Sequence, residues 1–469
     1  MLPDEIIYNF AGANVAGAAR LRGRLDADIL RRCLLEIVGR HEVLRTTYHA
    51  GADGRGVQHV RAVPDVPLPV ADLRDIPEAE REEAARERAR QEIARPFDLE
   101  HDLMLRPVLL RLADEEHLLV LCQHHVATDG WSIGVLIREV AELYSAFAAG
   151  RAPALPPLPV QYGDYAVWHR EWLTGARLER QLEYWRGQLA GSRLVDVGTG
   201  LPRATTLTWD GGTLEYRMPA DLWRGLTQLA DSEHATPYMA LLAAYSIVLA
   251  RWSGQDDIVI GCPIAGRTTS EVEPLIGCFL NELPIRLNLS GEPTYRDLLR
   301  QARKVSLEAY AHQYVPFEKI VEEVNPERDA MSHAPLVRHQ LGLHNEPQWR
   351  AELPGVTMEL ATLSTGTSRF GLEVDLSVEA SGGLHGMVYY STDLYDGAVV
   401  QRMLDRLTTV VAGAVAAGAV ADPDRPFSRL PLLGAAGLRS CGAARGGRGA
   451  GRPAARRPPP PARTSTARS

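Results

Sequence analysis

The chain has 469 residues, 45% of them hydrophobic, and a formal net charge of −8 at pH 7. This length and apolar content allow large cores and more than one lobe. The negative charge argues against a general nucleic-acid or membrane-surface protein, and no apolar stretch approaches the ~20 residues that span a bilayer. Asp4 and Glu5 stand where a signal peptide would be basic, and the five cysteines are scattered, so we expect a cytoplasmic protein with reduced thiols.

The first half of the chain alternates predicted helices and strands. Asp26 is a candidate N-cap for a helix with an apolar face over residues 29–38. Glu and Arg alternate from 77 to 95, which indicates a solvated, ion-paired helix. The apolar run 118–122 predicts a buried strand, and the spacing of apolar residues predicts a helix from near Trp131 to Ala148.

The second half repeats a similar alternation. Thr236 followed by Pro237 predicts a helix start, because a cap precedes a proline in the first turn. Thr294 with Asp297 resembles a capping box for a second helix that continues through Tyr310. Strands are predicted at 257–261, 372–378 and 384–390. Mixed strands and helices in two comparable halves predict an α/β or α+β fold class.

The predicted strand 118–122 leads into the run His-His-Val-Ala-Thr-Asp-Gly-Trp-Ser at 124–132. Side chains alternate across a strand, so His124 and His125 cannot both serve one site, and we expect one to be structural and the other chemical. Gly130 lets the backbone come close to a substrate. We predict no metal site, because the two histidines diverge and no Cys, His or Glu cluster nearby completes a ligand set.

Six further blocks follow this motif or precede it. They lie at 40–48, 162–168, 276–286, 312–318, 328–329 and 334–336. In this order and spacing the blocks resemble the condensation domains of nonribosomal peptide synthetases, whose core motif is HHxxxDG. The resemblance runs from about Tyr8 to Leu433, which is nearly the whole chain.

Both ends depart from the family pattern. Members of the family usually begin with a further helix before the Tyr8-Asn9 pair, and here that helix is missing. Either translation starts upstream of Met1 or part of the first lobe is absent. From Arg439 onward the tail contains arginine but no acidic residue, lysine or aromatic, so we expect disorder. A frameshift is the simplest hypothesis for this tail, and nucleic-acid binding a weaker one.

The resemblance implies two lobes, each like a chloramphenicol acetyltransferase subunit, arranged as a V-shaped pseudo-dimer with a central tunnel. We assign residues 1–173 to the N-terminal lobe, 174–434 to the C-terminal lobe and 435–469 to the tail. The two histidines of the motif would lie in the middle of the tunnel. Carrier domains would dock at its two mouths.

The reaction implied by the resemblance is attack by an acceptor amine on a donor acyl thioester, both held on phosphopantetheine arms of carrier proteins. An imidazole with a pKa near ~6.5 suits the proton exchange. We assign this role to His125, as general base or as the acceptor that orients the amine, and a structural role to His124. Partners are then the donor and acceptor carriers with small acyl and amine substrates. We expect no directly bound cofactor, no nucleic acid and no membrane.

The remaining motif residues receive supporting roles. The resemblance implies that Asp129 is a scaffold in an ion pair with an arginine, and Arg286 matches that position. Gly130 would place a backbone N–H near the developing oxyanion. Trp131 and Ser132 complete the turn and are candidate substrate-binding residues, with Ser132 either hydrogen-bonding the intermediate or capping the helix.

Two residues of the 276–286 block are predicted near the cavity. Asn281 is expected to reach the channel and bind substrate. Cys278 is expected to approach the cavity, without a role as nucleophile.

Three alternatives remain at this point. The order Trp131-Ser132 is typical of the condensation branch, whereas epimerisation relatives tend to invert it. Ester formation needs only an alcohol in place of the amine. A non-catalytic domain that recruits carriers is the third alternative, although such relatives usually lose the histidines that this chain retains.

Overall fold

The computed structural model describes residues 14–52, 54, 56–63, 65–197, 208–324, 336–344, 350–361, 366–419 and 426–431. The predictions made for Tyr8, for the block at 328–329 and for the tail 435–469 lie outside the described residues.

The first half of the chain contains six strands, five α-helices and two short 3₁₀ turns within the described residues. In chain order these are β1 (Asn14–Gly23), α1 (Ala27–Arg40), η2 (Glu42–Arg45), β2 (Thr46–Ala50), β3 (Gly56–Val60), β4 (Val70–Asp72), α2 (Glu78–Ala94), β5 (Leu105–Ala113), β6 (Glu116–His124), η3 (His125–Ala127), α3 (Gly130–Ala148), α4 (Tyr162–Trp172) and α5 (Gly175–Leu189).

The second half is again mixed. Its described elements are β7 (Gly211–Met218), α6 (Ala220–Ser232), α7 (Pro237–Ser253), β8 (Asp257–Ile264), β9 (Asn281–Asn288), α8 (Tyr295–Ala311), α9 (Phe317–Val324), β10 (His339–His344), β11 (Arg350–Leu353), β12 (Val356–Ala361), β13 (Leu372–Val378), β14 (Leu384–Ser391), α10 (Gly397–Ala419) and η4 (Phe427–Arg429). The mixed α/β fold class predicted from the sequence is confirmed.

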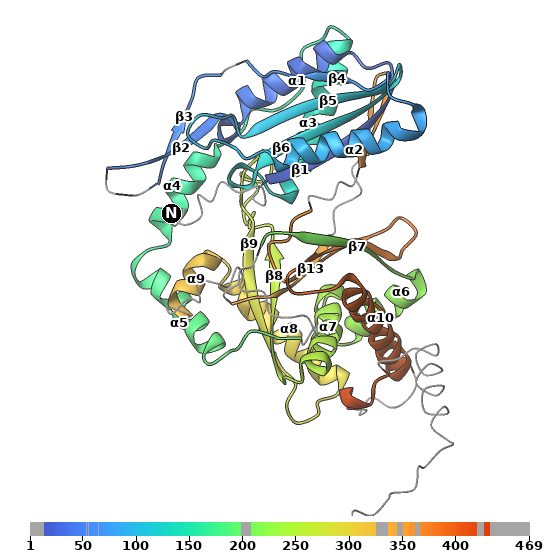
Figure 1. Cartoon of the computed structure of the whole chain (residues 1–469). Coiled ribbons are helices and arrows are strands. Elements are labelled where there is room, and N and C mark those ends of the chain that lie inside the picture. The colour runs from blue at the N-terminus through green and yellow to red at the C-terminus, as the bar shows by residue number, and fades with distance from the viewer. Residues whose placement is uncertain are drawn as a thin grey trace, which may run out of the picture.

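The first sheet has the strand order β11-β12-β1-β6-β5-β4. Alternate residues of β6 face opposite sides: Leu119 packs under α1 and α3, whereas Leu118 and Val120 pack against Ala85 and Ala89 of α2. The sheet is therefore covered on both faces. Figure 1 shows these elements together in the upper part of the molecule.

Two strands of this sheet come from the second half of the chain. β12 pairs antiparallel with β1, with Leu21 opposite Met358, and β11 pairs with β12. Met358 is buried in the same core as α1 and α3. The sequence assigned all of 174–434 to the second lobe, but this excursion adds residues 350–361 to the first sheet.

The second sheet has the order β7-β14-β13-β10-β8-β9. Its central strands β8, β10 and β13 pair in parallel, and the flanking pairs are antiparallel. Helices α7, α8 and α10 lie on the side away from the first sheet (Figure 1). Alternate β9 residues, including Leu283, Ile285 and Leu287, are fully buried in the core shared with these helices.

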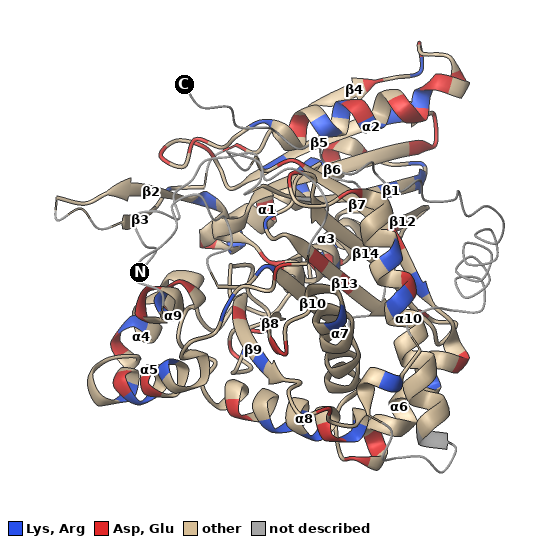
Figure 2. Ribbon diagram, turned by 60° about the horizontal axis from the view of Figure 1, so that its bottom comes forward, with Lys and Arg blue, Asp and Glu red and all other residues tan. Residues whose placement is uncertain are grey.

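Local sequence signals determine several helix starts as predicted. The Asp26 carboxylate accepts from two backbone N–H groups of α1, and Thr236 caps α7 with Pro237 in the first turn. Thr294 and Asp297 form a reciprocal capping box on α8. Helix α2 carries alternating charges along its exposed side (Figure 2). No helix within the described ranges is long and apolar enough to cross a membrane.

Candidate active site

The histidine pair lies where β6 ends and the chain turns toward α3. His124 is the last residue of β6, and His125 opens the short turn η3. Asp129 is the N-cap of α3 and accepts from the Ser132 N–H at 2.8 Å. The strand–turn–helix corner predicted from the sequence is therefore present.

The His124 ring is held by a backbone group of the turn that follows it and by a neighbouring aromatic ring. Its Nδ1 accepts a hydrogen bond from the Val126 N–H at 3.2 Å, and its ring packs edge-on against Phe97. Because Nδ1 is an acceptor, the proton of the neutral ring lies on Nε2, a buried atom with no partner within the described residues. Burial lowers the pKa of His124 to about 4. These contacts fit the structural role expected of this residue.

His125 differs in its surroundings. The residue is partly exposed, and its Nδ1 lies 3.4 Å from Cys278 Sγ. Burial, together with the charge of Arg369, lowers the pKa of His125 to about 3. The imidazole is therefore neutral at pH 7, which is the form that accepts a proton.

The buried acid of the motif pairs with Arg267, and the predicted partner Arg286 is wrong. Arg267 Nη2 lies 2.9 Å from Asp129 Oδ1, with both side chains almost completely buried. Arg286 instead pairs with Asp257 and donates to two backbone carbonyls at the C-terminal end of α5. The antiparallel register of β8 and β9 sets Val259 opposite Arg286, which places the guanidinium beside the start of β8.

The guanidinium of Arg267 binds several groups of the loop between β8 and β9. Nη1 donates to the carbonyls of Val272 and Leu275, and Nη2 also donates to Ser132 Oγ. The guanidinium carbon lies 4.1 Å from the centre of the Phe279 ring. We call residues 272–279 the crossing segment, because they leave the second sheet and dock on the start of α3.

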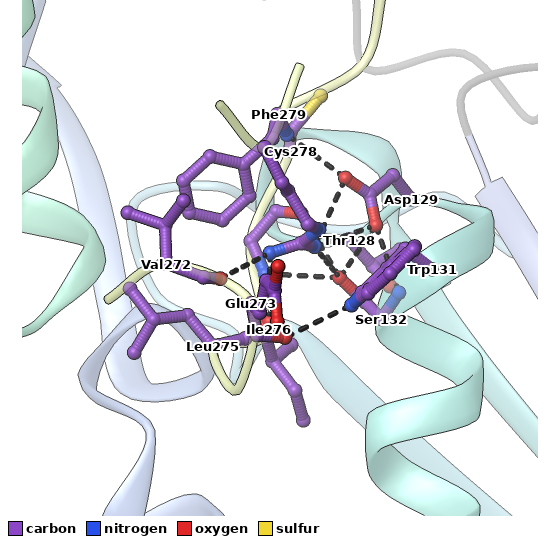
Figure 3. A network of polar contacts seen from close by, with 12 residues as sticks. Thr128, Asp129, Trp131, Ser132, Val272, Glu273, Leu275, Ile276, Cys278 and Phe279 are labelled. Carbon is purple, nitrogen blue, oxygen red and sulfur yellow. Dashed lines mark hydrogen bonds and ion pairs between the residues drawn. The ribbon is translucent and has the colours of Figure 1, made fainter. Parts of the chain in front are cut away.

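The crossing segment is bonded to the first lobe along most of its length (Figure 3). Ser132 Oγ accepts from the Gly277 N–H and lies 3.0 Å from its carbonyl oxygen. Asp129 Oδ2 accepts from the Phe279 N–H at 2.9 Å, and Trp131 Nε1 donates to the Glu273 carbonyl. The buried His41 ring accepts from the Ile276 N–H, and Tyr162 donates to the Cys278 carbonyl.

These bonds change the roles predicted for Trp131 and Ser132. The sequence predicts that both touch substrate, but the indole N–H of Trp131 and the buried hydroxyl of Ser132 hold the crossing segment. Gly130, by contrast, is exposed at the start of α3. A Cβ built on it meets no atom within 4 Å.

Asn281 also departs from its predicted role as a substrate ligand. Its Nδ2 donates to the carbonyls of Gln313 and Val315, and its Oδ1 accepts from the Phe317 N–H. The amide thus fastens the loop before α9 to β9. Its polar atoms are engaged by backbone groups rather than open to a substrate.

Comparison with known proteins agrees with the motif and the fold. A family model described as "Condensation domain" matches residues 9–436. The chain belongs to the condensation domain family. The resemblance predicted from the sequence is thereby confirmed, and membership of this family implies acyltransferase-type chemistry.

The curated relatives are much longer proteins. One of the subunits of linear gramicidin synthase from Brevibacillus parabrevis is 40% identical over 435 residues, which cover 92% of this chain and 6% of that protein. Phosphinothricin tripeptide synthetase PhsB of Streptomyces viridochromogenes is 39% identical over 419 residues, 88% of this chain and 34% of that protein. The chain thus spans a small part of the synthetases that it matches.

Solved structures share the fold. The X-domain from teicoplanin biosynthesis superposes with a TM-score of 0.80 at 29% identity, covering 91% of this chain and 94% of that one. The first condensation domain of the calcium-dependent antibiotic synthetase, in complex with a substrate analogue, gives a TM-score of 0.74 at 21% identity, covering 92% and 96%. The second likeness supports the fold alone.

Sequence reasoning missed Arg267 and Arg369 as members of the site, and it placed Cys278 near the cavity without a contact. Arg267 follows the end of β8 by three residues, and an arginine directly after a buried strand is a weak signal for a buried partner. No pattern in the sequence marks Arg369, whose charge acts on both histidines.

The two aspartate–arginine pairs allow a direct stability test. Asp129→Ala leaves the buried Arg267 without its counter-ion, and we expect a loss of ~3–5 kcal/mol in the free energy of unfolding. Asp257→Ala is the matched control, because its pair with Arg286 is partly exposed and should be worth about 1 kcal/mol or less. Urea denaturation followed by circular dichroism measures both. Equal losses would contradict the assignment of Arg267 as the buried partner.

The protonation state of His125 can be observed without turnover. Because burial lowers its pKa, the ring should remain neutral from pH 8 down to about pH 5, well below the ordinary value near 6.5. The experiment is NMR of ¹³C-labelled histidine, with the His125 signal identified by its loss in His125→Ala. A midpoint near pH ~6.5 for this signal would show that the ring is not desolvated.

Proposed function

We propose that this chain catalyses amide formation between an acceptor amine and a donor acyl or aminoacyl thioester. The observation that carries the proposal is the neutral imidazole of His125. It sits at the family's motif with Nδ1 turned to Cys278 Sγ, which leaves Nε2 as the other ring nitrogen. That nitrogen is the group on the corner best suited to accept a proton from an amine.

The chemistry balances with one proton acceptor. The amine nitrogen bonds to the thioester carbonyl carbon while its proton passes to His125 Nε2. The carbonyl oxygen becomes an oxyanion, and the backbone N–H of Gly130 at the start of α3 is the proposed donor toward it. Collapse of this intermediate breaks the carbon–sulfur bond, and the thiol leaves with a proton.

Holding the reactants in place supplies most of the acceleration. A general base contributes ~10²–10⁴-fold, so positioning of the two substrates supplies much of the remainder. We propose that both substrates arrive on phosphopantetheine arms of carrier proteins, as expected for a domain that matches the synthetases. Donor and acceptor carriers are then the partners, reaching His125 from two sides of a passage between the lobes.

Ester formation differs from amide formation only in the acceptor substrate. An alcohol would transfer its proton to the same imidazole as an amine. The order Trp131-Ser132 supports condensation over epimerisation. A recruiting role is the second candidate, because the X-domain from teicoplanin biosynthesis, which has also been solved in complex with OxyB, shares 29–30% identity with this chain. The retained pair His124-His125 favours catalysis.

The proposed base is tested with the purified chain and two loaded carriers. His125→Ala should lower the rate of product formation by ~100-fold or more, because it removes the proton acceptor. His59→Ala, on the exposed strand β3, is the control and should react like the wild type. Product is measured by mass spectrometry, with matched amine and alcohol acceptors in parallel. Full activity of the His125→Ala variant would exclude the proposed base.

Gly130 tests the proposed passage. Gly130→Leu should fold normally, since a Cβ there meets no atom within 4 Å, but the larger side chain should obstruct the approach of a substrate arm. We expect an unchanged melting temperature and a rise in KM for the carrier-bound substrates. Gly163→Leu is the control, because a Cβ built there also meets no atom within 4 Å and the residue has no positive φ. Gly150 is unsuitable, because its φ of 66° would strain any larger residue. Wild-type kinetics of Gly130→Leu would show that no substrate passes there.

A further inference from the structure

Cys278 lies beside His125, and hydrogen bonds to the first lobe hold the backbone around it in place. The neighbouring backbone groups on both sides are bonded to the first lobe, Gly277 to Ser132 and Phe279 to Asp129. The Cys278 carbonyl accepts from the Tyr162 hydroxyl at 2.8 Å. The side chain between these anchors has its Sγ 3.4 Å from His125 Nδ1. Such a fixed contact constrains the orientation of the ring, and the direction of its hydrogen bond sets the tautomer.

The thiol does not compete as a nucleophile. Burial raises the pKa of Cys278 to about 12, and the nearby Asp129 charge acts in the same direction. A thiol that keeps its proton is a weak nucleophile. Its sulfur remains a weak acceptor, and its S–H a weak donor.

The two possible hydrogen-bond directions have different consequences for the ring. If the thiol donates to Nδ1, the proton of the neutral imidazole lies on Nε2, and no lone pair is available to an amine. If Nδ1–H donates to the sulfur, Nε2 carries the lone pair. Only the second arrangement allows the reaction proposed above.

We propose that Cys278 is a positioning residue whose sulfur accepts the Nδ1–H of His125 and thereby keeps the Nε2 lone pair directed to the acceptor substrate. This inference rests on the proposed condensation activity and deepens it. The sulfur belongs to the second half of the chain, whereas the histidine belongs to the first. Docking of the crossing segment therefore selects the reactive tautomer of the base.

The test compares Cys278→Ala with Cys278→Ser in the full chain. Loss of one weak hydrogen bond should reduce kcat about three- to tenfold in Cys278→Ala with little change in KM. The serine hydroxyl again offers an acceptor, so Cys278→Ser should recover part of that loss. Circular dichroism and urea denaturation verify that both variants fold like the wild type.

A second measurement reports on the tautomer directly. In ¹⁵N-histidine-labelled protein, the ring nitrogens of His125 distinguish a protonated from an unprotonated position. We expect Nδ1 to carry the proton in the wild type and in Cys278→Ser, and the Nε2-protonated form to grow in Cys278→Ala. A ring whose tautomer is the same in all three proteins would overturn the proposal, whatever the rates.

The outcomes separate this inference from the proposed function. If the wild type forms no product from loaded carriers, the condensation proposal fails, while the tautomer measurement still decides the role of Cys278. If the wild type is active and Cys278→Ala has the same kcat, the positioning role fails and the function stands.

Discussion

The ion pair between Asp129 and Arg267 is the interaction on which the site depends. Both charges are withdrawn from water, and such a pair is tolerated only when its remaining donors and acceptors are satisfied. Here the guanidinium binds carbonyls of the crossing segment, and the carboxylate binds the N–H groups of Ser132 and Phe279. The same two side chains therefore cap the start of α3, bind backbone groups of the crossing segment and connect this segment to the helix. Removing either charge leaves the other buried without its counter-ion.

Two separate segments of the second half of the chain join the first lobe. The crossing segment extends from the second sheet to α3 of the first lobe, where Ile276 enters the core. Strands β11 and β12 also leave the second half and extend the first sheet beside β1. The corner that carries His125 contacts the crossing segment through Cys278. A site built from both lobes in this way responds to how the lobes are placed, which a site within one lobe would not.

Local patterns predicted local structure well. The caps at Asp26, Thr236 and Thr294 and the strand before His124 depend on neighbouring residues only, so spacing and residue type were sufficient. The alternation of strands and helices predicted the mixed fold class, and the ordered sequence blocks indicated the family. The buried partner of Asp129 was not predictable in this way. Arg267 reaches it through the irregular path of the loop between β8 and β9, and Arg286 stands on a strand whose register commits it to Asp257.

Desolvation has two effects at this corner that work together. It lowers the pKa of His125, so the ring is a neutral proton acceptor, and it raises the pKa of Cys278, so the thiol is a neutral neighbour. A charged thiolate beside the ring would instead favour the imidazolium and remove the acceptor. The nearby Arg369 opposes protonation of His125 as well. The proposed reaction therefore depends on a neutral base in one tautomer, and the crossing segment, which carries Cys278, is the part of the fold that contacts this base.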